Sequence, residues 1–151
     1  MSKKYIGLIL ILMAVSAESS DLNIKSMDSP MELLVHKTPT CGCCKMWVKH
    51  MENNGFAIRT QDHQSLEKIK TMLKIEPQFR SCHTGVSSNG YFFEGHIPSE
   101  YVSKFLSENN PDAIGLSVPG MPLGSPGMEV EDRFTPYDVL IHFKNGETKV
   151  Y

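Results

Sequence analysis

The chain has 151 residues, of which 40% are hydrophobic and 21% charged; these values indicate one globular domain and exclude a disordered chain. The formal net charge of −2 excludes the strongly basic surface that is typical of nucleic-acid binding. Four cysteines, nine methionines and six histidines are notable, because these residue types supply the soft and borderline ligands of metal ions.

The N-terminus has the layout of a secretory signal peptide. Lys3 and Lys4 precede the apolar run 6–15, which is shorter than a membrane-spanning helix, and Val15-Ser16-Ala17 offers small residues for cleavage. A short membrane anchor is the alternative, and we consider it the weaker one. We therefore expect a protein exported to the periplasm, with no membrane anchor in its mature form and with a formal charge of −4 once both lysines are removed. The predicted organisation is a signal peptide at 1–17, a polar linker at 18–30 and one domain at 31–151.

The first half of this domain reads as a β-α-β unit. An apolar run at 31–37 predicts a strand, and 56–60 alternates as a second strand. Between them a helix is predicted from the cysteine-rich segment to Asn54, and Asn54-Gly55 ends it. Its apolar stripe follows the i, i+3, i+4, i+7 pattern of a helix packed on one face. The stripe consists of Cys44, Trp47, Val48 and Met51.

The next elements complete a β-α-β-α-β-β-α order. Ser65 is a candidate N-cap for a helix that ends before Pro77. Short strands at 84–87 and 91–94 flank the hairpin turn Asn89-Gly90, and Pro98-Ser99 opens a third helix. This order predicts an α/β fold with a thioredoxin-like βαβ-αββα core.

The C-terminal part of the chain differs in composition. Residues 111–136 are rich in proline and glycine and predict a long loop, in which Pro119-Gly120-Met121 recurs as Pro126-Gly127-Met128. Segments 138–144 and 147–151, joined by Asn145-Gly146, predict a β-hairpin. The core is therefore expected to carry a Pro/Gly/Met loop and a β-hairpin as an extension.

The strongest chemical signal is the segment Cys41-Gly42-Cys43-Cys44. It lies between a strand and a helix, and amide groups at a helix N-terminus stabilise a thiolate, which is the form that attacks disulfides and binds metals. The Cys41/Cys44 pair alone fits a disulfide oxidoreductase, but Cys43 favours a soft-metal site, because several adjacent thiolates can bridge metal ions. A structural disulfide with a spare thiol is the plainest alternative.

Cys82 and His83 are expected to join this cluster. They precede the strand at 84–87, and in a thioredoxin-like fold that loop, which usually holds a cis-proline, lies beside the first strand–helix junction. The loop methionines, Met121 and Met128, carry thioethers that suit Cu(I), although methionines in such loops also pack simply as hydrophobic side chains. His96 is a further candidate ligand, and so is His36 at the end of the first strand.

The remaining histidines and methionines fit the site less well. His50 lies seven residues beyond Cys43, about 10 Å along a helix, and cannot share one ion with it. His63 and His142 show no grouping in the sequence. Three methionines at helical spacing are expected to pack instead of binding metal. They are Met46, Met51 and Met72.

Copper fits this donor set better than the alternatives. Zinc sites of cysteine and histidine are usually structural, and zinc gives the methionine loop no role. Iron–sulfur ligation needs differently spaced cysteines, whereas closely spaced thiolates together with thioethers and imidazoles match Cu(I).

Four segments in combination resemble the CopG-type periplasmic copper-resistance proteins, a bacterial family with a thioredoxin-like metal-binding domain. The similarity covers about 31–151. The resemblance implies copper binding at the cysteines, with a role in copper tolerance and a redox function on copper ions. The segments are Thr40–Lys45, Ser81–Thr84, Glu94–Pro98 and Pro119–Glu129.

The expected function is thus that of a periplasmic copper-binding protein that holds Cu(I) in a cysteine-rich site. More than one copper ion in the site, and turnover as a copper oxidoreductase that interconverts Cu(I) and Cu(II), are extensions that the sequence leaves open. So are the alternatives of a thiol–disulfide oxidoreductase using Cys41 and Cys44, and of a passive copper store or chaperone. Copper ions and other periplasmic copper-handling proteins are the expected partners. The candidate metal ligands are Cys41, Cys43, Cys44, Cys82, His83, His96, Met121 and Met128.

Overall fold

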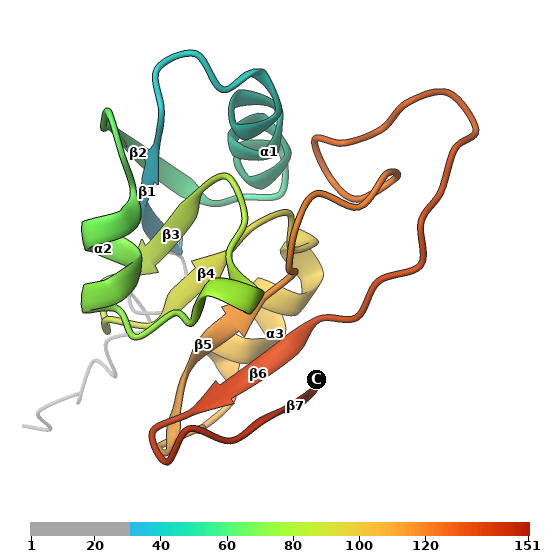
Figure 1. Ribbon diagram of the computed structural model, residues 1–151. Coiled ribbons are helices and arrows are strands. Elements are labelled where there is room, and N and C mark those ends of the chain that lie inside the picture. The colour runs from blue at the N-terminus through green and yellow to red at the C-terminus, as the bar shows by residue number, and fades with distance from the viewer. Residues whose placement is uncertain (1–30) are drawn as a thin grey trace, which may run out of the picture.

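The computed structural model describes residues 31–151, so the predicted signal peptide and linker lie outside the described residues. The chain forms a seven-stranded mixed sheet in the order β2-β1-β3-β4-β5-β6-β7, with helices packed against it (Figure 1). The strands are β1 (Glu32–Lys37), β2 (Ala57–Asp62), β3 (Thr84–Ser87), β4 (Phe92–Glu94), β5 (Ala113–Ser117), β6 (Leu140–Phe143) and β7 (Thr148–Val150). The helices are α1 (Gly42–Asn53), α2 (Glu67–Met72), α3 (Ser99–Ser107) and the 3₁₀ turn η2 (Pro77–Phe79).

The predicted β-α-β-α-β-β-α order is confirmed, and so is the α/β class. β1 pairs with β2 in parallel and with β3 in antiparallel orientation, and β3 pairs with β4 across the predicted hairpin turn. The thioredoxin-like description of this order stays a prediction. One difference from it is visible: His83 directly precedes β3, and every peptide bond within 31–151 is trans.

The predicted loop 111–136 is wrong in its first part, because Ala113–Ser117 forms β5 between β4 and β6. The apolar side chains of Ala113 and Leu116 are buried there. Gly115 allows the close approach to β4, since a Cβ at this position would lie 2.2 Å from the carbonyl oxygen of Phe92. A glycine that suggested a loop in the sequence therefore serves tight strand packing instead.

Helix α2 is shorter than the sequence indicated. The Ser65 hydroxyl accepts a hydrogen bond from the Glu67 amide at 3.3 Å, but α2 ends at Met72, and Pro77 starts the separate turn η2. Met46 and Met72, which were expected to pack against other side chains, are instead largely exposed, with exposed fractions of 53% and 72%. Only Met51 of the three is fully buried.

The core lies between the sheet and helices α1 and α3. Trp47 of α1, Phe93 of β4 and Phe105 of α3 are almost completely buried. Burying a phenylalanine side chain contributes about 1.5–3 kcal/mol relative to leaving it exposed. The indole Nε1 of Trp47 donates a hydrogen bond to the Ile97 carbonyl oxygen at 2.8 Å. This contact fixes α1 directly below its cysteine-bearing first turn.

The predicted hairpin at the C-terminus is confirmed as β6 and β7, which extend the sheet beyond β5. The long connection from β5 to β6, residues 118–139, leaves the sheet and passes near α1 (Figure 1). Within residues 31–151, none of the helices has the length and apolarity that crossing a bilayer requires.

Candidate metal centre

The cysteine-rich segment forms the start of helix α1. Cys41 is the N-cap residue, and its sulfur accepts a hydrogen bond from the Cys44 amide at 3.3 Å. Cys43 and Cys44 therefore lie in the first helical turn, where unpaired backbone amides favour negative charge on sulfur. Cys44 is fully buried, whereas Cys41 and Cys43 are half-buried.

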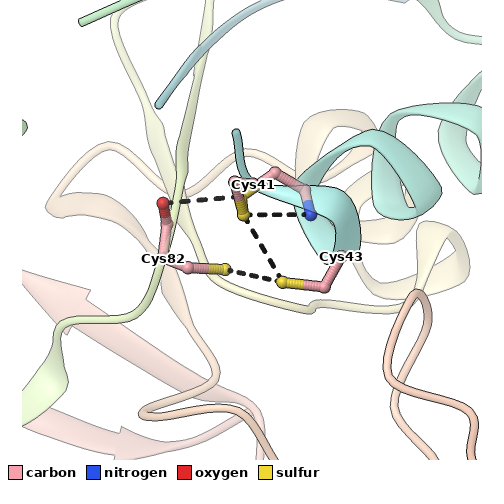
Figure 2. Close-up of side chains that lie close together, drawn as sticks. Cys41, Cys43 and Cys82 are labelled. Atoms are coloured by element: carbon pink, nitrogen blue, oxygen red, sulfur yellow. Dashed lines mark hydrogen bonds between the residues drawn. A yellow bond between two sulfur atoms is a disulfide. The ribbon is translucent and has the colours of Figure 1, made fainter. Parts of the chain in front are cut away.

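All four cysteines converge at this point, as the topology predicted. Cys41 and Cys44 are joined by a disulfide, while Cys43 and Cys82 are free thiols. The Sγ atom of Cys43 lies 3.4 Å from that of Cys41 and 3.7 Å from that of Cys82. Figure 2 shows Cys82 reaching from the chain segment before β3 toward the start of α1. The four sulfur atoms lie within 4.8 Å of one another.

Two imidazoles extend the sulfur cluster on the side of Cys82. The Cys82 Sγ atom lies 3.3 Å from His83 Nδ1 and 3.1 Å from His96 Nε2. His96 Nδ1 lies 2.8 Å from the Pro126 carbonyl oxygen and donates to it, which leaves Nε2 unprotonated and directed at the thiol. A backbone carbonyl in this position is the usual outer partner of a metal-binding histidine. The predicted ligands His83 and His96 thus lie beside Cys82.

The spacing of these donor atoms fits a metal ion. Two sulfurs held at about 2.3 Å in tetrahedral geometry lie about 3.8 Å apart, and a sulfur and a nitrogen about 3.5 Å apart. The Cys43–Cys82 distance of 3.7 Å matches the first value, and the two Cys82–imidazole distances are a few tenths of an ångström shorter than the second. In addition, His83 Nε2 is buried without a hydrogen-bond partner among the described residues.

Burial sets the ionisation of these groups. It raises the pKa of the Cys82 thiol to about 12, with a further contribution from Cys43. It lowers the pKa of His83 well below its usual value, together with His96 and Lys70, and it also lowers the pKa of His96. In the metal-free protein both imidazoles are therefore neutral and Cys82 is protonated, so that a metal ion must displace the thiol proton.

A buried ion pair holds the segment that carries Cys82. Lys70 of α2 and Glu94 of β4 are 4% and 0% exposed, and the ammonium donates to the carboxylate. Lys70 also donates to the Ser81 carbonyl at 3.0 Å, while the Ser81 amide donates to Glu94 at 2.6 Å. The Thr84 hydroxyl donates to the second carboxylate oxygen at 2.5 Å. These bonds bracket Cys82 on both sides.

The proline- and glycine-rich loop rests on the first turns of α1. A Cβ at Gly127, whose φ is +85°, would lie 2.8 Å from both the Cys43 carbonyl oxygen and the Trp47 nitrogen. The loop also bonds to the Cys82 segment, because the Gly120 amide donates to the Arg80 carbonyl at 3.2 Å. Protein contacts thus place the loop beside the cysteines without a metal ion.

The two loop methionines differ in their surroundings. Met128 is half-buried and directly follows Gly127, the residue in contact with α1. Met121 is 53% exposed and lines a cavity of about 460 Å³ together with Tyr137 and Leu140, and none of the four cysteines lines that cavity. Met128 therefore adjoins the loop residue that contacts α1, whereas Met121 is largely exposed at a cavity that the cysteines do not line.

The other histidines bond elsewhere. His36 contacts His63 instead of the cysteines, and His50 Nε2 accepts a hydrogen bond from the Ser99 amide at 3.1 Å. His142 Nε2 lies 2.7 Å from the Ser117 hydroxyl. The expectation that His63 has no grouping is wrong, because β1 and β2 bring it against His36. Sequence reasoning also missed Lys70 and Glu94, since a buried ion pair gives no periodic signal.

Comparisons with known proteins identify the family of this chain. Residues 79–128 match a family model described as a protein of unknown function, DUF411, and these residues contain Cys82, His83 and His96. No protein with a curated description matches the chain. A solved structure titled copper resistance protein copG, form 2, is 40% identical with a TM-score of 0.76, covering 81% of this chain and 96% of that one. Form 1 is also 40% identical, with a TM-score of 0.75 and coverage of 81% and 95%. The chain therefore belongs to the family of the CopG copper resistance proteins.

Proposed function

We propose that this chain is an exported copper-binding protein of copper tolerance that holds Cu(I) at its cysteine cluster. The main support for this proposal is the convergence of four sulfur atoms and two neutral imidazoles around Cys82. The names of the similar structures, copper resistance proteins, support copper as the metal. Periplasmic location is supported by the predicted signal peptide. An intact-mass measurement of the mature protein tests it, because the chain is then expected to begin near residue 18.

The bound form requires the Cys41–Cys44 disulfide to be reduced. Four thiolates within 4.8 Å then exceed the needs of one Cu(I) ion and can bridge several. His83 and His96 complete the site beside Cys82. The loop that rests on α1 at Gly127 carries Met128 and Met121 as candidate thioether ligands. We therefore expect the reduced protein to bind more than one Cu(I) ion and the disulfide form to bind fewer.

The same residues provide a redox step. Two Cu(II) ions take one electron each from the Cys41/Cys44 dithiol, which gives two Cu(I) ions, the disulfide and two protons. The disulfide of the present structure corresponds to the oxidised product, and a thiol reductant returns it to the dithiol. Cys43 assists this return, since its sulfur lies 3.4 Å from that of Cys41 and can exchange with the bond.

Copper titration of the reduced protein tests the binding proposal. Cu(I) is added anaerobically in competition with a chromogenic chelator, and the Cys43→Ser variant is compared with the unsubstituted chain. The variant is expected to fold normally, because the half-buried side chain changes by one atom, and to bind fewer copper ions. Saturation at one copper ion or none, or equal stoichiometry in the variant, contradicts the multinuclear cluster.

Thiol counting tests the redox step and separates the alternatives. Cu(II) added to the reduced protein is expected to consume one thiol for each Cu(I) formed. A Cys41→Ser variant, which lacks the Cys41/Cys44 dithiol, is expected to form less Cu(I). A passive copper store binds Cu(I) without reducing Cu(II). The disulfide also fits a general thiol–disulfide oxidoreductase, which would reduce a protein disulfide such as that of insulin with no copper present.

A further inference from the structure

Two histidines face one another at the ends of strands β1 and β2, in addition to the two beside the cysteines. His36 Nδ1 lies 2.9 Å from His63 Nε2, and the ring centroids are 5.1 Å apart at an interplanar angle of 50°. Both residues are half-buried. Neither belongs to the cysteine cluster or to the group formed by Cys82 with its two imidazoles.

The backbone fixes this encounter. In the parallel β1–β2 ladder His36 is aligned with Gln61, and side chains two residues apart share a face, so His63 projects on the same side of the sheet as His36. The His63 amide extends the ladder by donating to the Lys37 carbonyl at 2.9 Å. The two rings are therefore held by sheet hydrogen bonds and not by a mobile loop.

The neighbouring charges balance one another. Lys37, the buried residue after His36, forms an ion pair with Asp62 at 2.5 Å, directly before His63. Both alternate with the histidines along their strands and so lie on the opposite face of the ladder. Arg59 of β2 lies two residues before Gln61 and so shares the face of the histidines, but it forms an ion pair with Glu32. Each cationic side chain of β1 and β2 therefore has a carboxylate partner.

The separation of the two nitrogens suits a shared ion. Two imidazole nitrogens bound at about 2.0–2.1 Å and at a right angle lie about 2.9 Å apart, and right angles between nitrogen and oxygen ligands are typical of Cu(II). Burial and the neighbouring His63 also lower the pKa of His36, which favours the neutral imidazole that binds metal.

We propose that His36 and His63 form a second metal site, which binds one Cu(II) ion through two imidazole nitrogens and water. It is separate from the thiolate cluster and complementary to it, because nitrogen and oxygen donors suit Cu(II) whereas thiolates select Cu(I). The plain alternative is a hydrogen bond that only ties β1 to β2. That alternative predicts lower stability without His63, but no change in copper binding.

The test uses the full mature chain with the Cys41–Cys44 disulfide intact and with Cys43 and Cys82 replaced by serine, which removes the free thiols. Cu(II) sulfate is titrated and followed by electron paramagnetic resonance. The His36→Ala and His63→Ala variants are each expected to lose one equivalent of bound Cu(II) with a nitrogen hyperfine pattern. His50→Gln is the matched control, because it alters another half-buried histidine that bonds only to a backbone amide.

A second measurement keeps the proposal decisive if a variant fails to fold. In the chain with His36 and His63 present, substoichiometric Cu(II) is expected to broaden the imidazole NMR signals of both residues. Unchanged Cu(II) equivalents in the two alanine variants, or sharp His36 and His63 signals, overturn the second site. Cu(I) titration of the reduced chain is independent of these results, so failure of the thiolate cluster and failure of the histidine site are distinguishable.

Discussion

The buried Lys70–Glu94 pair allows a quantitative prediction about what positions Cys82. Replacing Glu94 with glutamine keeps the shape of the side chain but leaves the Lys70 ammonium, which is 4% exposed, without a counter-charge. Breaking a buried ion pair in this way costs about 3–5 kcal/mol of unfolding free energy. Glu94→Gln is therefore expected to lose about that amount.

The mechanism can be separated from a general sensitivity to substitution. Adding Lys70→Met to Glu94→Gln removes the buried ammonium that the single substitution leaves without a counter-charge. The double variant is therefore expected to lose about 1–3 kcal/mol less unfolding free energy than the two single variants lose in sum. Glu32→Gln is the matched control, because the Glu32–Arg59 pair is 47% and 71% exposed, and such surface pairs contribute about 0–1 kcal/mol.

Urea unfolding provides the measurement. Trp47 is the single tryptophan and is fully buried, so its fluorescence reports on the core next to the site. A Glu94→Gln loss below about 1 kcal/mol, or one equal to that of Glu32→Gln, refutes the reasoning. If the pair positions Cys82, the folded variant also retains Cu(I) less tightly, whereas Glu32→Gln does not.

Three further predictions concern the loop and the far side of the sheet. Gly127→Ala is expected to lift the loop from α1 and to weaken copper retention. Gly120→Ala is the control and is expected to leave retention unchanged, because Gly120 has a similar positive φ of +69° but no atom within 4 Å of the added Cβ. Equal effects of the two substitutions on copper retention argue against the contact. Met121→Ala is expected to reduce copper retention but to change the stability of the metal-free protein by only about 0.5 kcal/mol, because the side chain is half exposed. A loss of several kcal/mol in thermal unfolding would instead place Met121 in the core. Burial lowers the pKa of His142, so as the pH falls the unfolded chain takes up a proton at this residue before the folded chain does. The contribution of His142 to the free energy of unfolding is therefore complete above about pH 6.5 and is lost as the pH falls below that value. His142→Gln should flatten the pH dependence of urea unfolding in this window, and parallel stability-against-pH curves for the variant and the unsubstituted chain would exclude the effect.

The sequence predicted those parts of the molecule that local rules determine. Hydrophobic periodicity located α1 and its buried stripe, and the Asn89-Gly90 and Asn145-Gly146 turns located both hairpins. The approach of Cys82 to Cys43 also followed from the order of elements, because a strand–helix junction and the loop before β3 meet at one end of the sheet. Thus the position of the site could be derived without coordinates.

Other features depend on register and packing, which local patterns do not encode. β5 was hidden because Gly115 and the neighbouring prolines resemble a loop, although the glycine is needed for close strand contact. The pairing of His36 with His63 depends on the alignment of β1 with β2, residue by residue. The disulfide between Cys41 and Cys44 was one of several pairings that four cysteines allow.

The anchoring of the long loop has a consequence for how this family can vary. Ser117 and Leu140 are aligned partners in the β5–β6 ladder, so the sheet itself brings the two ends of the loop together. The entropy of closing a flexible loop changes slowly with its length, by about 0.6 kcal/mol for each doubling. Insertions between these two strands are therefore inexpensive in folding free energy. Natural variants can lengthen or shorten this segment, and so alter what lies over the cysteines, while the strands and α1 beneath remain unchanged.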